Sequence, residues 1–424
     1  MWTRSSAARC FIRRNMFSLV LFAMALIFVS TTANFANAQT FTLLHMFTGS
    51  PDGANPFGGL VADRNGNYYG TTEYGGVHNY GSIFELSPPA LSGGAWTEAV
   101  IWSFAGGADG SYPSFQLVMD GGGRLYGETQ GGGSAACGCG TVFELAPPKE
   151  SGGNWAKRVI YTLTSGDHPY GGVILDSGGS VYGTQVHGGT FGLGQAFKLS
   201  PNANRSFTET TLYNFGATHA DSKQPFGPLN MDSSGNLYGV SLYGGMRNLG
   251  TVYRLTPPAS GTGSWSNSIL RTFIGGASGC SPEGNLILDS LGRLYGTATG
   301  CGGVADNGVI FQLTPPTGSG PWVESVLHTF GATDGGGAYP SLSLDTKAEV
   351  FYGTSYYGGL YGVVFKLAPP AAAGEAWSES VLHTFTGGVD GAGPLGPIVW
   401  DANGVLYGTG FEAAGKGVAF SITP

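Results

Sequence analysis

Apolar and polar residues alternate with a period of two along short stretches of the chain, and Gly, Pro or Asp bounds each stretch. In the first complete unit these stretches are residues 56–63, 66–72, 81–86 and 96–104, separated by a short turn, a Gly-Gly loop and a Pro-Pro pair. Such alternation between turn-forming residues predicts β-strands. No unit contains ten residues with the 3.6-residue period of a helix, so we expect an all-β fold.

The four-strand unit is repeated seven times along the chain. Its most regular mark is a Tyr-Gly pair that starts at Tyr69, Tyr126, Tyr182, Tyr238, Tyr295, Tyr352 and Tyr407, with spacings of 57, 56, 56, 57, 57 and 55 residues. A fixed period of this size indicates a repeat architecture, and four short strands per unit are typical of a propeller blade. We therefore predict a seven-bladed β-propeller with four antiparallel strands per blade. A solenoid is the structural alternative.

The strands of each unit are called A to D in chain order, and the two ends of the repeat region predict how the ring closes. Residues 41–47 match the D strand, as in residues 326–330, whereas residues 417–422 match the C strand. The first segment can therefore supply the missing outer strand of the last blade, which leaves no open sheet edge at the chain ends.

The Tyr-Gly pair predicts how neighbouring blades fit together. The tyrosine ring is expected to fill the gap between blades, with a partner for its hydroxyl group, while the bare glycine accepts the neighbouring sheet. Strand A is expected to line the axis, where Gly58, Gly59 and Gly172 permit close approach of the backbone.

Composition and charge narrow the class of protein. Gly supplies 75 of 424 residues and charged residues only 11%, yet aromatic residues make up 12%, which disordered chains rarely contain. The net charge is −8 and no basic stripe runs along any repeat, so nucleic acid is not an expected partner. We expect a monomer that contains no cofactor and no metal.

Residues 1–38 predict a signal peptide. A start with four arginines precedes the apolar residues 16–29, and Ala36 and Ala38 place small side chains where a signal peptidase reads the chain. The mature propeller would then comprise residues 39–424 and be secreted or periplasmic. A membrane anchor is the alternative, but the apolar run is short for a span of roughly 20 residues. No later segment is apolar enough to cross a bilayer.

The repeated blocks Leu-Tyr-Gly-Thr, Gly-Gly and Gly-Thr-Val-Phe-x-Leu-x-Pro-Pro resemble those of GloVer-type tandem-repeat exported bacterial proteins, over essentially all of residues 40–424. The resemblance implies export, often with an anchor after the repeats, and brings no established reaction with it. Because no anchor follows the last repeat before Pro424, we expect free secretion or periplasmic residence rather than surface attachment.

Strand order assigns the loops to two faces. The D–A and B–C loops share one face, here called the top face, and the A–B and C–D loops share the bottom face. A–B turns repeat an aspartate at Asp63, Asp120, Asp176, Asp232, Asp289 and Asp401, which we expect to cap its own turn. D–A loops repeat another at Asp52, Asp109, Asp167, Asp221, Asp334 and Asp390, with Ser278 in the fifth unit. These are also interpreted as turn formers, a cation-binding ring of carboxylates being the alternative.

One position of the B–C loop varies while its neighbours are nearly fixed. It holds Tyr74, Gly131, His187, Tyr243, Gly300, Tyr357 and Glu412. We expect this position to form a ring around the top mouth, where aromatic side chains can stack on sugar faces or other flat ligands. The predicted ligand-binding residues are Tyr74, His187, Tyr243, Tyr357 and Glu412. The alternative is that these side chains only cover the glycine loops.

Histidines and acidic residues suggest a second kind of site. Asp167, His168 and His187 belong to the third unit, and His219 and Asp221 to the fourth. Together they are a candidate acid–base or metal cluster, although their spacing matches no known metal motif and solvated loop histidines are the alternative. By contrast, His45, His328 and His383 share a D-strand position, and a structural role is predicted for them.

Carboxylates that could cleave a glycoside are Glu73, Glu128 or Glu412 together with a loop Asp. Nothing in the sequence pairs them. They are therefore candidates without a predicted partner.

Four cysteines remain after removal of the signal peptide, and an oxidising compartment favours disulfides over free thiols. Cys280 lies in a D–A loop and Cys301 in the B–C loop of the same unit, so a disulfide between them is predicted. Cys137 and Cys139 are one residue apart and form either a small ring or take part in other chemistry.

We predict an exported propeller that acts as a binding or interaction module, with an extracellular carbohydrate or cell-wall polymer as ligand. A protein partner is the alternative ligand. Two other functions stay open, because propellers support many functions. One is a carbohydrate-active or antibiotic-inactivating lyase or hydrolase, favoured by the uneven placement of His and Asp. The other is a structural surface-display protein.

Overall fold

The computed structural model describes residues 39–424 except 92, 135, 151, 165–168, 262, 303–305, 332–333, 337–340, 373 and 413–414. The predicted signal peptide, residues 1–38, lies outside the described residues. The described part contains strands and two short 3-10 turns, η1 (Gly107–Asp109) and η2 (Gly276–Ser278). No helix in this part is long and apolar enough to cross a bilayer.

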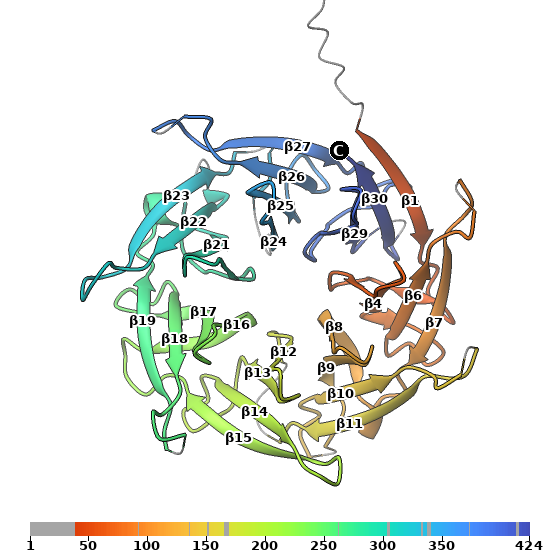
Figure 1. The fold of residues 1–424 in the computed structure, drawn as a ribbon, viewed down its shortest axis with the longest axis horizontal. Coiled ribbons are helices and arrows are strands. Elements are labelled where there is room, and N and C mark those ends of the chain that lie inside the picture. Colours follow the sequence, from red (N-terminus) through yellow and green to blue (C-terminus); the bar gives the residue numbers. More distant parts are fainter. Residues whose placement is uncertain are drawn as a thin grey trace, which may run out of the picture. The chain divides into compact units, whose positions relative to one another are not determined.

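Seven antiparallel four-stranded sheets surround a common axis, so the chain is a seven-bladed β-propeller, as predicted (Figure 1). Blade one contains β3 (Val61–Ala62), β4 (Tyr68–Thr72), β6 (Ser82–Ser87) and β7 (Thr97–Ser103). Blade two contains β8 (Ser111–Met119), β9 (Leu125–Gly131), β10 (Thr141–Ala146) and β11 (Ala156–Thr162). Blade three contains β12 (Val173–Leu175), β13 (Val181–Gln185), β14 (Gln195–Pro201) and β15 (Phe207–Asn214).

The remaining blades repeat this order. Blade four contains β16 (Ser222–Met231), β17 (Leu237–Gly244), β18 (Thr251–Thr256) and β19 (Ser266–Thr272). Blade five contains β20 (Ile287–Leu288), β21 (Leu294–Ala298), β22 (Val309–Thr314) and β23 (Val323–Thr329). Blade six contains β24 (Ser341–Asp345), β25 (Val350–Ser355), β26 (Val363–Ala368) and β27 (Ser378–Thr384). A separate pair joins β2 (Gly53–Ala54) to β5 (Tyr74–Gly75).

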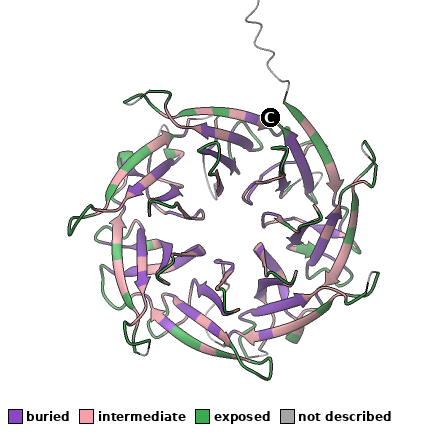
Figure 2. Cartoon of the chain, in the orientation of Figure 1, coloured by how far each residue is buried: buried purple, intermediate pink, exposed green. Residues whose placement is uncertain are grey.

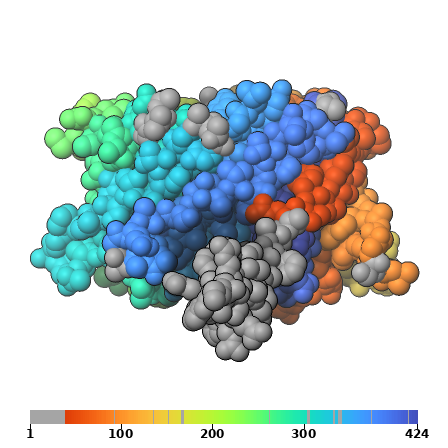
Figure 3. Space-filling model, turned by 90° about the horizontal axis from the view of Figure 1, so that it is seen from above, coloured from red at the N-terminus to blue at the C-terminus, as the bar shows by residue number. Residues whose placement is uncertain are grey.

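Blade seven is completed by the start of the chain. It contains β28 (Val399–Trp400), β29 (Leu406–Gly410), β30 (Val418–Thr423) and, as its outer strand, β1 (Thr40–Met46). β1 and β30 pair antiparallel from Thr40↔Thr423 to Met46↔Val418, and Figure 3 shows β1 in red against the blue last blade. The predicted closure of the ring is confirmed.

The apolar core is divided into seven clusters, one at each junction between blades. In every cluster the tyrosine of a Tyr-Gly pair packs among residues of the next blade; Tyr126, for example, joins Val173 and Phe197. Figure 2 shows that buried residues concentrate on the inner and middle strands, while exposed residues lie on the outer strands and loops. The predicted role of the tyrosine as filler between blades is therefore confirmed.

The glycine of the pair has a different role from the predicted one. A Cβ atom on Gly70 would lie 2.5 Å from Cζ of Phe84, the residue directly opposite on strand C of the same blade. Gly353 faces Phe365 in the same way. The bare glycine thus accommodates a phenylalanine of its own sheet rather than the neighbouring sheet.

The aspartate of the A–B turn caps its own turn, as predicted. In blade three, Oδ1 of Asp176 accepts hydrogen bonds from the backbone N–H groups of Gly178 and Ser180, and Oδ2 accepts one from the Tyr182 hydroxyl at 3.0 Å. The same Tyr–Asp bond occurs in blades one, two, four, five and seven. This bond gives the buried tyrosine hydroxyl its partner.

Candidate ligand-binding face

The mouth of the ring on the top face is built from residues in a left-handed backbone conformation. The residue before the proline of strand A has a positive φ in each blade where it is described, with values of 59° at Asn55, 58° at Tyr112, 55° at Gln224, 49° at Ser281 and 59° at Gly393. Its N–H donates to a carbonyl in the B–C loop of the preceding blade, as from Tyr112 to Tyr80 at 2.8 Å.

This conformation has a cost that points to function. It costs a non-glycine residue roughly 1–2 kcal/mol, and Gly393 shows that glycine fits the same position. The asparagine, tyrosine, glutamine and serine at the other blades therefore place side chains at the mouth at the expense of stability. Strain of this kind is concentrated at ligand sites.

Three tyrosines form a cluster where blades one and two meet. Tyr74 and Tyr80 are each 39% exposed, and the Tyr112 ring lies between them, with centroid distances of 5.4 Å to Tyr74 and 5.9 Å to Tyr80. Burial, followed by the nearby charge of Glu73, raises the pKa of Tyr74. Its hydroxyl therefore stays protonated at neutral pH and is hydrogen-bonded to the Glu73 carboxyl.

The other predicted tyrosines are also exposed. Tyr243 in blade four is 45% exposed, and Tyr357 in blade six is 55% exposed beside Tyr361, which is 44% exposed. Tyr356 packs edge-on against Tyr357 with the ring centroids 4.9 Å apart, and its hydroxyl donates to Oε1 of Glu412 at 3.2 Å. The predicted position thus presents aromatic side chains from three blades to solvent.

His187 is held by the neighbouring blade. The side-chain nitrogen of Gln224 donates to Nε2 of His187 at 2.9 Å, while Nδ1 of His187 is buried without a hydrogen-bond partner among the described residues. This contact links a predicted rim residue to one of the left-handed residues of the mouth.

The predicted acid–base cluster is only partly visible. Asp167 and His168 lie outside the described residues, and His219 is exposed. Asp221 is buried and accepts hydrogen bonds from three backbone N–H groups and from Tyr213 and Asn267. Among the described residues, none of the groups of His, Cys, Asp and Glu close enough to share an ion includes His187, His219 or Asp221. The cluster stays a prediction.

Closer to the axis than the exposed tyrosines of the B–C loops lies a second layer of aromatic residues, which we did not predict from the sequence. Phe57, Tyr170 and Phe226 follow the proline of strand A, and Phe115 is close to the equivalent place in blade two. The Tyr170 and Phe226 rings stack at 5.5 Å, and Phe57 and Phe115 lie 5.3 Å apart. Phe57 and Phe115 border an axial cavity of about 170 Å³ that is otherwise lined mainly by the glycine-rich A strands. The sequence signal that could have identified this layer is the aromatic residue directly after the A-strand proline in three of the blades.

Two carboxyl groups lie within this layer. Glu283 takes the position after the proline in blade five and borders the axial cavity. Burial raises its pKa to about 7, an effect that a hydrogen bond with Thr299 partly offsets. Burial also raises the pKa of Glu73, and the charge of Glu73 helps to raise the pKa of Tyr170. Because the pKa of Glu283 is about 7, its carboxyl can both donate and accept a hydrogen bond near neutral pH.

Glu128 does not belong to the top face. It is 2% exposed on β9, and no hydrogen-bond partner of normal geometry reaches either carboxyl oxygen. Burial raises its pKa to about 8, and the backbone N–H of Gly172 partly offsets that effect. Glu128 is therefore a neutral core residue rather than one of the carboxylates that act on a ligand.

Both disulfides are present. Cys280 is bonded to Cys301, and the backbone N–H of Cys280 donates to the Gly300 carbonyl at 2.7 Å, so the D–A and B–C loops of blade five are joined at the mouth. Cys137 is bonded to Cys139 within the B–C loop of blade two.

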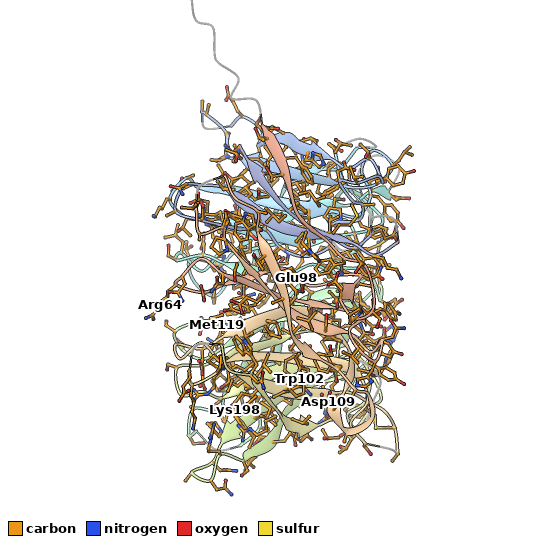
Figure 4. All side chains as sticks on the ribbon, turned by 90° about the vertical axis from the view of Figure 1, so that its right-hand side faces the viewer. Arg64, Glu98, Trp102, Asp109, Met119 and Lys198 are labelled. Atoms are coloured by element: carbon orange, nitrogen blue, oxygen red, sulfur yellow. A yellow bond between two sulfur atoms is a disulfide. The ribbon has the colours of Figure 1, made fainter. Side chains whose placement is uncertain are left out.

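A larger hollow lies on the bottom face. It is an open groove of about 1460 Å³ between blades one and two, bordered by Arg64, Met119 and Trp155; Arg64 and Met119 are labelled in Figure 4. A similar groove of about 970 Å³ lies between blades three and four. Turns, Pro-Pro loops and strand residues border both grooves. We place the candidate site at the top mouth, where the exposed tyrosines lie.

The fold and the mouth define the class of protein as a seven-bladed β-propeller with an aromatic-lined axial opening. The chain belongs to the family described as the Gloeobacter/Verrucomicrobia repeat, whose model matches residues 27–227, 97–300 and 224–424. This confirms the resemblance to GloVer-type repeats. No curated protein matches the chain.

Solved structures share the fold. The extracellular domain of a protein assigned as a one-component system of B. thetaiotaomicron is 12% identical, with a TM-score of 0.52, over 91% of this chain and 41% of that one. PorZ, a surface component of the type-IX secretion system of Porphyromonas gingivalis, is 15% identical, with a TM-score of 0.51, over 89% of this chain and 47% of PorZ. The chain thus spans less than half of each protein, and the likeness shows the fold alone.

Proposed function

We propose that the protein is an exported binding module whose top face holds an extracellular carbohydrate or cell-wall polymer. The observation that supports this most directly is the set of exposed tyrosines around the mouth, Tyr74, Tyr243 and Tyr357. Aromatic rings offer a flat apolar surface together with a polar group, which suits the mixed C–H and hydroxyl surface of a sugar. The proposed pocket is the mouth, with the axial cavity beneath it.

Export is part of this proposal. Two disulfides in one chain are typical of a protein from an oxidising compartment. They agree with the signal peptide that the sequence predicts. A secreted or periplasmic protein would meet polysaccharides rather than nucleotides or nucleic acids.

Native affinity electrophoresis tests the proposal. Residues 39–424 are run through gels that contain individual cell-wall and plant polysaccharides, and we expect retardation by at least one of them. Tyr74→Ala and Tyr357→Ala should each weaken that retardation roughly two- to tenfold, because each removes one stacking surface. Leu91→Ala is the matched control, since Leu91 is 80% exposed on a C–D loop of the bottom face. Unretarded migration in every gel would remove the carbohydrate ligand and leave a protein partner or a display role.

Cleavage of the bound polymer is the second candidate function, and Glu283 favours it. A carboxyl with a pKa of about 7 still holds a proton at neutral pH and can pass it to a leaving oxygen as a general acid. A cleared zone behind the migrating band would indicate this activity. Glu283→Gln should then abolish the clearing and leave the retardation.

A further inference from the structure

At six of the seven junctions between blades, those whose D–A loop residue is described, the outer wall of the propeller carries a three-residue cluster. Its members are a residue near the end of one D strand, the residue of the following D–A loop, and a residue of the next blade's D strand. At the closing junction they are His45 on β1, Asp52 and Glu98 on β7. His45 Nε2 lies 3.2 Å from Oδ2 of Asp52.

Four other junctions balance the charge of this cluster or cover it. Between blades one and two, Lys157 Nζ bonds Asp109 at 2.8 Å beside Trp102. Between blades three and four, Tyr213 and Asn267 donate to Asp221 at 3.0 and 2.9 Å. Between blades four and five, the loop acid is replaced by Ser278, and Arg271 pairs with Glu324 at 2.5 Å. Between blades six and seven, His383 bonds Asp390 at 3.2 Å and Phe41 stacks on the histidine ring at 4.2 Å.

At two junctions, neither a lysine nor an arginine in the part of the chain that the structure describes balances the charge of the carboxylates in the cluster. The clusters His45–Asp52–Glu98 and His328–Asp334–Glu379 each hold two carboxylates and one histidine, with one ligand atom from each residue within 4.8 Å of the others. In both, Oε1 of the glutamate is buried and has no hydrogen-bond partner among the described residues. The same is true of Glu324, but its other carboxyl oxygen pairs with Arg271. Figure 4 labels Glu98 on the outer wall, with Trp102 and Asp109 of the balanced neighbouring junction.

A buried carboxylate oxygen without a partner is costly, and such groups are normally paired with a cation or coordinate a metal. At the first of these clusters, the Lys157 position of the balanced junction is taken by Glu98, so no side chain of the cluster other than a protonated His45 supplies positive charge. One imidazole and two carboxylates within a few ångströms are a donor set suited to a transition-metal dication. Calcium is less suited, because it prefers oxygen ligands alone.

We propose that each of the two clusters binds one transition-metal dication, for which zinc is the probe, through histidine Nε2 and one oxygen of each carboxylate. On binding, the ion replaces the proton with which Nε2 now contacts the aspartate, and it gives the unpartnered glutamate oxygen a ligand bond. In the first cluster the ion would join β1 to blade one, and in the second it would join blades five and six. Each ion thus connects two blades.

The test uses residues 39–424 stripped of metal with a chelator and titrated with zinc in competition with a chromophoric chelator. We expect two zinc ions per chain and a higher Tm when zinc is bound. Glu98→Gln and Glu379→Gln should each leave one ion, and the double variant none. Glutamine keeps the size of the side chain, and the far-UV circular dichroism of each variant reports whether the fold is retained.

His383→Gln is the matched control, because its histidine–aspartate pair has Phe41 in place of the third ligand and should not bind the ion. We therefore expect this variant to keep two zinc ions. The proposal is overturned if the double glutamine variant retains both ions, or if the unaltered protein binds no zinc and its Tm does not change.

Discussion

At the residue scale, Glu128 takes the place of a repeated threonine, and its burial makes the free energy of unfolding depend on pH. In blades one, six and seven, the threonine after Tyr-Gly donates to a carbonyl on the innermost segment of the next blade, as from Thr71 to Phe115. Blade two has Glu128 at this place, with a pKa of about 8 because of its burial. The residue therefore fits the core only in its protonated form.

Glu128→Gln tests this reading. The carboxyl has an ordinary pKa of 4.5 and a folded pKa of about 8, so the folded chain holds a proton that the unfolded chain loses between these values. The contribution of Glu128 to stability therefore falls as the pH rises from about 5 to about 8, and is constant above that range. The glutamine variant should gain up to roughly 4 kcal/mol on the unaltered protein across this range.

Urea unfolding at pH 5, 6, 7 and 8 measures the difference. Glu150→Gln, on an exposed C–D loop, is the control and should follow the unaltered protein at each pH. Parallel profiles for Glu128→Gln and the unaltered protein would contradict the assignment of a neutral buried carboxyl.

At the element scale, the glycine of the Tyr-Gly pair makes room for an aromatic ring within each blade. The residue of strand C that pairs with this glycine is a phenylalanine in six blades and Tyr253 in blade four, and its ring occupies the space that a side chain on the glycine would take. A Cβ atom on Gly127 would lie 2.7 Å from Cζ of Phe143 and 2.8 Å from Cδ2 of Leu117. Gly127→Ala should therefore destabilise the protein by roughly 1–3 kcal/mol through overpacking.

Gly121→Ala, in the A–B turn of the same blade, is the control because a Cβ atom there meets nothing within 4 Å. Equilibrium urea unfolding compares the two variants. Equal stability of both would show that the phenylalanine moves aside at no cost.

The elements also show how far sequence reasoning reaches. Alternation and the repeat period are local signals, and they predicted the blades and the closing strand. Strand A of blade one is shorter than predicted, beginning at Val61 rather than Pro56, because the left-handed Asn55 and the glycines after Pro56 belong to the mouth instead of the sheet. The rim tyrosines were readable from one variable position. The cluster of His45 and Glu98 was not, because it depends on which blades become neighbours.

At the scale of the whole molecule, the ring is closed by the pairing of β1 with β30 in blade seven. β1 contributes Phe41 and Met46, and the next residue contributes Phe47, to the cores on either side of blade seven; Phe47 is only 1% exposed. Deleting residues 39–47 removes this packing together with the pairing to β30. Because the loss of one buried phenylalanine alone costs roughly 3–5 kcal/mol, we expect the Tm to fall by roughly 10 °C or more.

Differential scanning calorimetry measures this loss. Leu43→Ser changes a residue of β1 that is 39% exposed and should leave the Tm nearly unchanged. If the shortened chain has the same Tm as the intact chain, the stability of the ring does not depend on residues 39–47.

The pairing of β1 with β30 also fixes an order in time. A ribosome makes β1 first among the strands and β30 last, so β1 has no partner while every blade between them is being synthesised. Blades one to six contain no strand from the start of the chain, but the ring cannot close without the pairing of β1 with β30. The ring can therefore close only after β30 has been made, and until then β1 lacks the strand with which it pairs in the folded protein.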